Sequence, residues 1–152
     1  MKLDWSQLRP FSKLDQLAET IQKSAFLLSE NHHVTQSYLN HKGANFRIIN
    51  RVGEQEYDIL CCQINIEKTN YTFIPKNDLE RGLRNDLWIG LVLFIDGQKP
   101  AKYLFPSTVW NVPNELFTDS SIKHPEYGIN LNKNTIHILN EQYSFEKMLK
   151  EL

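Results

Sequence analysis

The stretch that decides the fold is Tyr57-Asp58-Ile59-Leu60-Cys61-Cys62-Gln63-Ile64-Asn65-Ile66-Glu67-Lys68. It is rich in β-branched and apolar residues and is nearly continuous in hydrophobicity between Ile59 and Cys62. That pattern is typical of a central strand whose two faces are both covered, so we expect residues 57–66 to form the middle strand of a sheet. Because residues two apart share a strand face, Gln63 and Asn65 lie on the same side of it.

Further elements follow from the patterns on either side of this strand. Residues 12–30 carry apolar side chains at helical spacing after Ser12, which together with Asp15 resembles a capping box, and they predict an amphipathic helix. Strands are predicted at 46–51, 71–74, 88–95 and 102–105, and short helices at 77–83 and 144–152. The segment between them predicts helical turns at 107–110 and 113–117, followed by a polar surface loop at 120–127.

Composition indicates one globular domain. With 152 residues, 41% of them hydrophobic, the chain is long enough for one sizeable core and short for two. We expect a single domain over 1–152, with a core at 12–110 and a C-terminal helical and loop extension at 111–152. Lys and Arg total 17 against 18 for Asp and Glu, which excludes a bulk positive field for nucleic acid.

No segment predicts insertion in a membrane or a redox function. The N-terminus lacks the apolar run of a signal peptide, and no stretch approaches the roughly 18 apolar residues of a membrane helix. We therefore expect a cytoplasmic protein without membrane contact. Cys61 and Cys62 are adjacent on the central strand and point to opposite faces, which disfavours a disulfide between them and predicts two buried thiols.

The order of these elements resembles a known family. A helix, three strands, a helix and a further strand are similar to the core of the PD-(D/E)xK superfamily, the restriction-endonuclease-like fold. Residues 86–94 followed by 103–107 resemble the strand and return that come after the active strand in many prokaryotic members. The resemblance covers roughly residues 12–110 and implies an α/β fold with a mixed central β-sheet flanked by helices.

In active members an Asp and a Glu or Gln bind a divalent cation, and a Lys stabilises developing charge at the scissile phosphate. In one register the Gln63-Ile64-Asn65 tripeptide matches the Glu/Gln-x-Lys motif, and Asn65 stands where the Lys belongs. The preceding strand then offers Asn45 and Asn50 in place of the Asp. Neutral amides supply neither charge, so this register predicts a site without catalysis. Glu19 falls in the region of an acidic residue that supports the metal in some members.

A second register keeps the charged groups. It assigns catalysis to Asp58, Glu67 and Lys68, with Asp58 and Glu67 as ligands of Mg²⁺, the single cofactor that this alternative requires. Together with Gln63 of the first register, these residues are the catalytic candidates. Glu67 and Lys68 are consecutive, so their side chains diverge on an extended strand unless a bulge reunites them.

Three functions remain open. The first is a non-catalytic or vestigial nuclease-like domain that binds nucleic acid or a protein partner, which the resemblance places in a prokaryotic defence or mobile-element setting. The second is a Mg²⁺-dependent DNA or RNA endonuclease, and the third is a protein-binding module of the immunity or antitoxin kind. Nucleic-acid binding needs a basic strip, for which the available residues are Lys42, Arg47, Arg51, Arg81 and Arg84.

Overall fold

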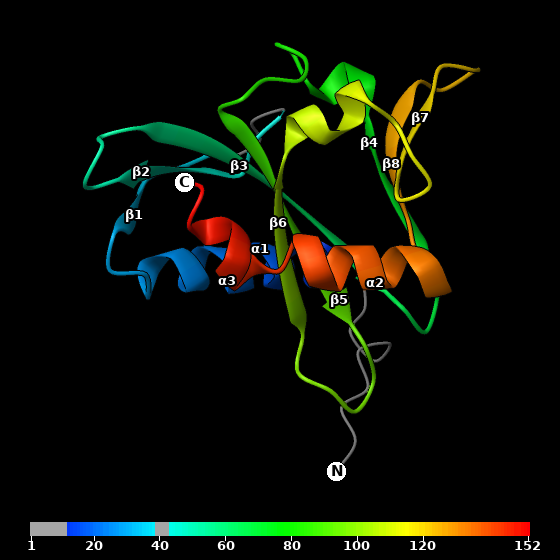
Figure 1. Cartoon of the computed structure of the whole chain (residues 1–152), viewed down its shortest axis with the longest axis horizontal. Coiled ribbons are helices and arrows are strands. Elements are labelled where there is room, and N and C mark those ends of the chain that lie inside the picture. Colours follow the sequence, from blue (N-terminus) through cyan, green and yellow to red (C-terminus); the bar gives the residue numbers. More distant parts are fainter. Residues whose placement is uncertain (1–11, 39–42) are drawn as a thin grey trace.

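The chain builds a mixed five-stranded sheet around the predicted central strand, as a computed structural model of residues 12–38 and 43–152 shows (Figure 1). The strands, in spatial order, are β1 (His32–Ser37), β2 (Phe46–Asn50), β3 (Glu56–Asn65), β5 (Leu87–Phe94) and β6 (Ala101–Pro106). β3 pairs with β5 in parallel, and the other neighbours pair antiparallel. The expected α/β class and mixed sheet are therefore confirmed.

A second, three-stranded sheet was not predicted. It consists of β4 (Tyr71–Pro75), β8 (Glu126–Asn130) and β7 (Phe117–Ser120), all antiparallel, with β8 in the middle. The strand expected at 71–74 exists, but it leaves β3 and pairs with a segment more than fifty residues later in the chain. The second sheet thereby joins the segment beyond residue 110 to the segment before it.

Helices and the second sheet cover the two faces of the main sheet. The helices are α1 (Ser12–Leu27), α2 (Lys133–Gln142) and α3 (Phe145–Leu149), with short 3₁₀ turns η2 (Lys76–Asp78) and η3 (Ser107–Asn111). Phe26 of α1 and Phe145 of α3 pack on one face. Trp110, Ile129 and Leu139 bring η3, the second sheet and α2 onto the other. None of the helices in the described residues is long and apolar enough to cross a membrane.

β5, next to β3 in the main sheet, has all eight of its residues buried. Gly90 leaves room for Gln22 of α1, since a Cβ at this position would lie 2.8 Å from the Gln22 carboxamide carbon. The Gln22 amide donates hydrogen bonds to the carbonyls of Leu91 (3.1 Å) and Tyr103 (3.3 Å). These bonds fix α1 against β5 and β6.

Several predicted boundaries and elements were wrong. The first helix ends at Leu27 rather than residue 30, and the helix expected at 77–83 is limited to η2. No helical turn forms at 113–117, because the Asn114 side chain accepts hydrogen bonds from the backbone N–H groups of Leu116 and Phe117 and starts β7. The loop expected at 120–127 is shorter, since β8 begins at Glu126, and β1 and α2 were missed.

Candidate functional site

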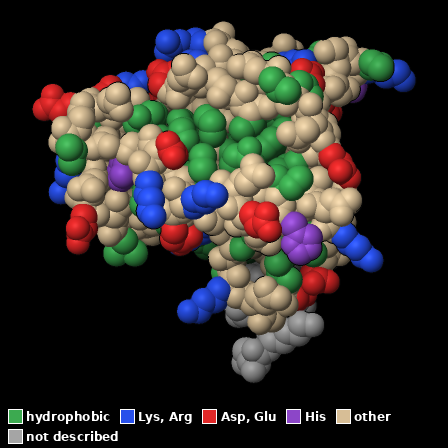
Figure 2. All heavy atoms as spheres, viewed as in Figure 1, with side chains coloured by type: hydrophobic (Ala, Val, Ile, Leu, Met, Phe, Trp, Pro, Cys, Tyr) green, Lys and Arg blue, Asp and Glu red, His purple; other side chains and the backbone are tan. Residues whose placement is uncertain are grey.

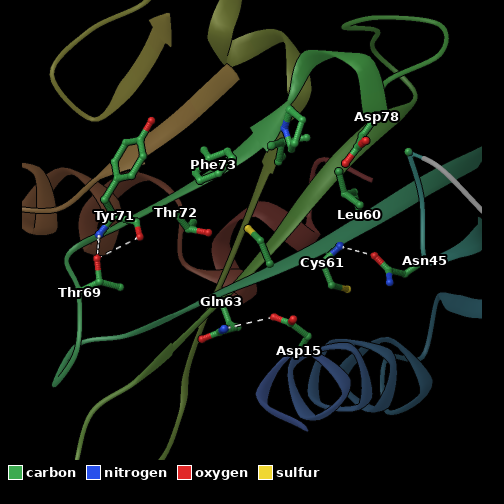
Figure 3. A pocket seen from close by; sticks show the side chains of 14 residues that line it. Asp15, Asn45, Leu60, Cys61, Gln63, Thr69, Tyr71, Thr72, Phe73 and Asp78 are labelled. Atoms are coloured by element: carbon green, nitrogen blue, oxygen red, sulfur yellow. Dashed lines mark hydrogen bonds between the residues drawn. The ribbon is translucent and has the colours of Figure 1, made fainter. Parts of the chain in front are cut away.

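A cavity of about 750 Å³ opens between β3, β4 and the start of α1 (Figure 3). β3 contributes its segment from Leu60 to Gln63, β4 contributes all of its residues, and α1 contributes Asp15. Figure 3 shows the Thr72 side chain turned toward the cavity and the Tyr71 side chain turned away from β3. Its volume is in the range of sites that hold small molecules or several side chains of a peptide.

The cavity forms because β3 loses its neighbour on one side. Pairing with β2 ends at Ile59, where the backbone N–H of Asn45 donates to the Ile59 carbonyl (2.7 Å). The Asn45 side chain extends the pairing by one step, accepting from the backbone N–H of Cys61 (2.7 Å). After β3, a turn in which Lys68 and Thr69 donate to the Asn65 carbonyl leads the chain away into β4. The diverging strands leave a wedge between them.

Gln63 lies in this wedge with an incomplete set of hydrogen bonds. It is 4% exposed, and its side-chain N–H group donates to the Asp15 carboxylate (3.2 Å). The amide nitrogen of Gln63 faces Asp15, because the opposite orientation would place the amide oxygen and the carboxylate, two acceptors, next to each other. Its Oε1 is buried and has no hydrogen-bond partner among the described residues. A buried acceptor without a donor is costly, and a ligand that supplies an N–H group removes that cost.

The structure brings together only part of the first register. Asn45 and Gln63 lie around one cavity with Asp15 and Asp78, and Asn65 follows on the same face of β3 with its Nδ2 buried and without a hydrogen-bond partner among the described residues. Asn50 lies at the other end of β2, where its side chain donates to the Leu152 carbonyl (2.6 Å). The set around the cavity holds two carboxylates and neutral amides. Glu19 lies one helical turn beyond Asp15 and is half-buried. Within residues 12–38 and 43–152, no group of three or more His, Cys, Asp or Glu side chains is placed to hold a metal ion.

The two cysteines line the cavity as protonated thiols. Desolvation by burial, reinforced by the charge of Asp15, raises the pKa of Cys62 to about 12. Burial, with Cys62 and Glu19 nearby, also raises the pKa of Cys61 well above its usual value. Since the thiolate is the reactive form, both thiols are in their less reactive state at neutral pH. The side chains are half-buried, not fully buried as the sequence predicted.

The carboxylate of Asp58, the predicted metal ligand, is occupied by hydrogen bonds and ion pairs within the fold. Its side chain is 7% exposed and accepts hydrogen bonds from Tyr38 (3.0 Å), Arg47 (3.0 Å) and Arg84 (2.8 Å). Burial alone would raise the pKa of Asp58, but the bonds from Arg47, Arg84 and Tyr38 outweigh it and lower the pKa. Arg84 also pairs with Asp86 (2.6 Å). These donors occupy the carboxylate that a metal would need.

The residues of the second register do not lie close together in the structure. Asp58 and Asn65 lie seven residues apart on one extended strand, which at about 3.3 Å per residue separates them by about 23 Å. Glu67 and Lys68 follow in the turn beyond Asn65, and both are exposed. No bulge interrupts β3 against β5, since their register is continuous from Asp58 to Asn65. The predicted metal pair of Asp58 and Glu67 is therefore not formed.

The predicted basic strip is also broken up. Arg47 and Arg84 are bound to Asp58, and Arg51 donates its Nε–H to His33 (3.0 Å). Arg81 is exposed, next to the loop that carries Arg84. Lys42 lies outside the described residues. Two of the four predicted arginines thus have their charge neutralised within the fold.

Comparisons of the chain with protein-family models, with curated proteins and with solved structures give no match. The resemblance to the PD-(D/E)xK superfamily therefore stays an expectation drawn from the sequence.

The sequence predicted Gln63 as a site residue, but neither its partner Asp15 nor the β4 residues that line the opposite side of the cavity. Asp15 reads locally as a helix-capping residue, and nothing in its neighbourhood points 48 residues ahead to Gln63. The residues of β4, including Phe73, read as an ordinary strand followed by a proline. The exposure of Phe73, at 49% on a strand, is a signal that only the folded chain supplies.

Proposed function

We propose that this chain is a non-catalytic binding domain that recognises a protein partner through the cavity between β3 and β4. Its scaffold is that of a nuclease-like domain whose site has lost its chemistry. The observation that carries this function is the Gln63–Asp15 pair, a neutral amide bound to a single carboxylate beside an unsatisfied acceptor.

The cavity lacks the groups that catalysis by a nuclease requires. Mg²⁺ is held by hard, mostly anionic oxygen ligands, and phosphodiester cleavage needs positive charge beside the scissile phosphate. The polar side chains of the lining include the carboxylates of Asp15 and Asp78 and the amides of Asn45 and Gln63, but no Lys or Arg among the described residues. In the resemblance, Asn65 stands where the ammonium belongs. Such a set orients a ligand by hydrogen bonds and leaves its covalent bonds intact.

A protein partner fits the charges better than nucleic acid does. The formal net charge is −1, and Arg47 and Arg84 are paired with Asp58. Figure 2 shows that, on the face that carries β6, hydrophobic side chains gather over the middle while Lys and Arg are interspersed with Asp and Glu. Phosphate contacts require a cationic track, and the described lining of the cavity holds the acids Asp15 and Asp78 and neither Lys nor Arg.

Site-specific photo-crosslinking tests this function. A benzophenone amino acid replaces Phe73 in the cavity or, as a control, Val112, which is exposed outside it. After irradiation in a native extract, we expect a polypeptide adduct from position 73 and none from position 112. In parallel, fluorescence anisotropy with labelled single- and double-stranded DNA and RNA should show no salt-dependent binding.

Three results would overturn the proposed function. The first is Mn²⁺-dependent cleavage of a nucleic acid that is lost in Gln63→Ala. The second is nucleic-acid binding whose affinity falls steeply with salt. The third is an adduct that forms equally from both positions, which would show that the cavity confers no selectivity.

A further inference from the structure

The cavity lies between two strand edges that each have one side without a strand neighbour. In β3, the N–H groups of Asp58 and Ile66 donate to Asp86 and Phe94 on the β5 side. Because the backbone groups of a strand alternate in direction, Gln63 turns its N–H and C=O away from β5. Pairing with β2 stops at Ile59, so these two groups of Gln63 have no partner among the described residues.

β4 repeats the arrangement on the opposite wall. Leu131 donates to the Asn70 carbonyl and Lys76 donates to the Pro125 carbonyl, so the even-numbered residues of β4 face β8. Phe73 therefore turns its backbone N–H and C=O away from β8. β4 is the outer strand of its sheet, and in the described chain these groups also lack a partner. Figure 3 shows Gln63 and Phe73 on the two walls of the same cavity.

Side chains at the cavity define what would fit between these edges. The walls are mainly apolar, with Leu60, Cys62 and Ile74 among their residues, and Phe73 is half-exposed. The charged residues in the described lining are Asp15 and Asp78, both acids, and Figure 3 places them at opposite ends. The lining is therefore acidic and calls for a ligand that carries positive charge and N–H donors.

We propose, resting on the binding function above, that the cavity takes an extended basic peptide segment of a protein partner, which adds as a strand between β3 and β4. The peptide backbone pairs with the free groups of Gln63 and Phe73. Its apolar side chains contact the cavity walls, and its Lys or Arg side chains reach Asp15 and Asp78. Strand addition of this kind takes affinity from the main chain and specificity from alternate side chains.

Selection from a phage-displayed library of random twelve-residue peptides supplies the probe. We expect the selected sequences to alternate β-branched and basic residues. On binding the strongest of them as a synthetic peptide, the backbone amides of Gln63 and Phe73 should become protected from hydrogen exchange. Asp15→Asn and Asp78→Asn should each weaken binding about two- to fivefold at low salt, whereas Glu141→Gln on α2 should not.

A proline substitution tests the backbone pairing itself. Phe73→Pro removes the N–H that faces the cavity and leaves the pairing of β4 with β8 intact, since an outer strand tolerates proline at such a position. Phe73→Ala removes the same side chain and keeps the N–H. We expect the proline variant to bind the peptide about three- to tenfold more weakly than the alanine variant, the value of one hydrogen bond. Thermal unfolding of both variants verifies that they fold.

The strand-addition model is overturned if no peptide is selected, if the two amides stay unprotected, or if the proline and alanine variants bind equally. These outcomes differ from a failure of the proposed function. A polypeptide adduct from position 73 without protection of the two amides supports the cavity as a binding site but refutes strand addition. Absence of the adduct refutes both the proposed binding function and strand addition.

Discussion

Replacing Asp58 by Asn separates a structural role of this carboxylate from a catalytic one. The substitution keeps the shape of the side chain and removes the charge that Arg47, Arg84 and Tyr38 contact. Hydrogen bonds to a charged group contribute about 1.5–3 kcal/mol each. The side chains of Arg47 and Arg84 are 34% and 19% exposed, so water compensates much of their loss. We expect Asp58→Asn to lower the free energy of unfolding by about 2–3 kcal/mol.

Urea unfolding at several pH values measures this effect. The folded-state pKa of Asp58 is lowered, so its stabilisation is present above the unfolded-state pKa of about 3.9 and is lost as the pH falls through the folded value. The difference between wild type and Asp58→Asn should therefore be full at pH 7 and should narrow below about pH 4. In thermal melts at pH 7, the variant should unfold about 6–9 °C lower, given about 3 °C per kcal/mol for a chain of this size.

Glu56→Gln serves as the matched control. Glu56 also pairs with Arg47, but its side chain is 52% exposed and the distance is 3.5 Å, so we expect a change below about 0.5 kcal/mol. A double-mutant cycle with Arg84→Gln should show a coupling free energy near 1 kcal/mol. Equal stability of Asp58→Asn and wild type would refute the reasoning. So would a Mn²⁺-induced rise in the melting temperature that requires Asp58, because it would make this residue a metal ligand.

Three further outcomes are expected. Gly90→Ala places a methyl group against Gln22 and should cost about 1–3 kcal/mol in urea unfolding, and the additional change Gln22→Ala should recover part of that loss. Cys62, with a pKa of about 12, should react with iodoacetamide at pH 8 far more slowly than in the urea-unfolded chain; equal rates would show an ionised thiol. Treatment with EDTA should leave the melting temperature unchanged, and a fall would reveal a resident metal.

The parts of the fold that were predicted from sequence have a strong local pattern. Residues 57–66 and 88–95 are dense in apolar residues because β3 and β5 have both faces covered, and both strands were placed within one residue of their bounds. β1 was missed because it is an outer strand whose residues are mostly polar and exposed after His32. The second sheet was missed because pairing of residues 71–75 with 126–130 is a long-range choice that no local pattern encodes.

In the candidate site, too, local sequence patterns predicted what lies on one strand but not which distant residues meet it. The two-residue period of a strand was enough to put Gln63 and Asn65 on one face, and it also counted against Glu67 and Lys68 acting together. That Asp15 meets Gln63 depends on how α1 crosses the sheet, which is set by the buried contacts of Gln22 with Leu91 and Tyr103. A capping residue thereby becomes a functional candidate only once the helix is docked.

The cavity itself results from topology more than from any one residue. β3 extends six residues beyond its last pair with β2, and β4 continues toward β8 instead of returning along β3. If β4 had paired with β3 as a hairpin, the backbone groups of Gln63 would be satisfied and the wedge would be filled. Because β4 is held in a second sheet, both edges keep their free groups at a fixed separation. A partner strand would therefore join two sheets that are already ordered, which keeps the entropic cost of binding low.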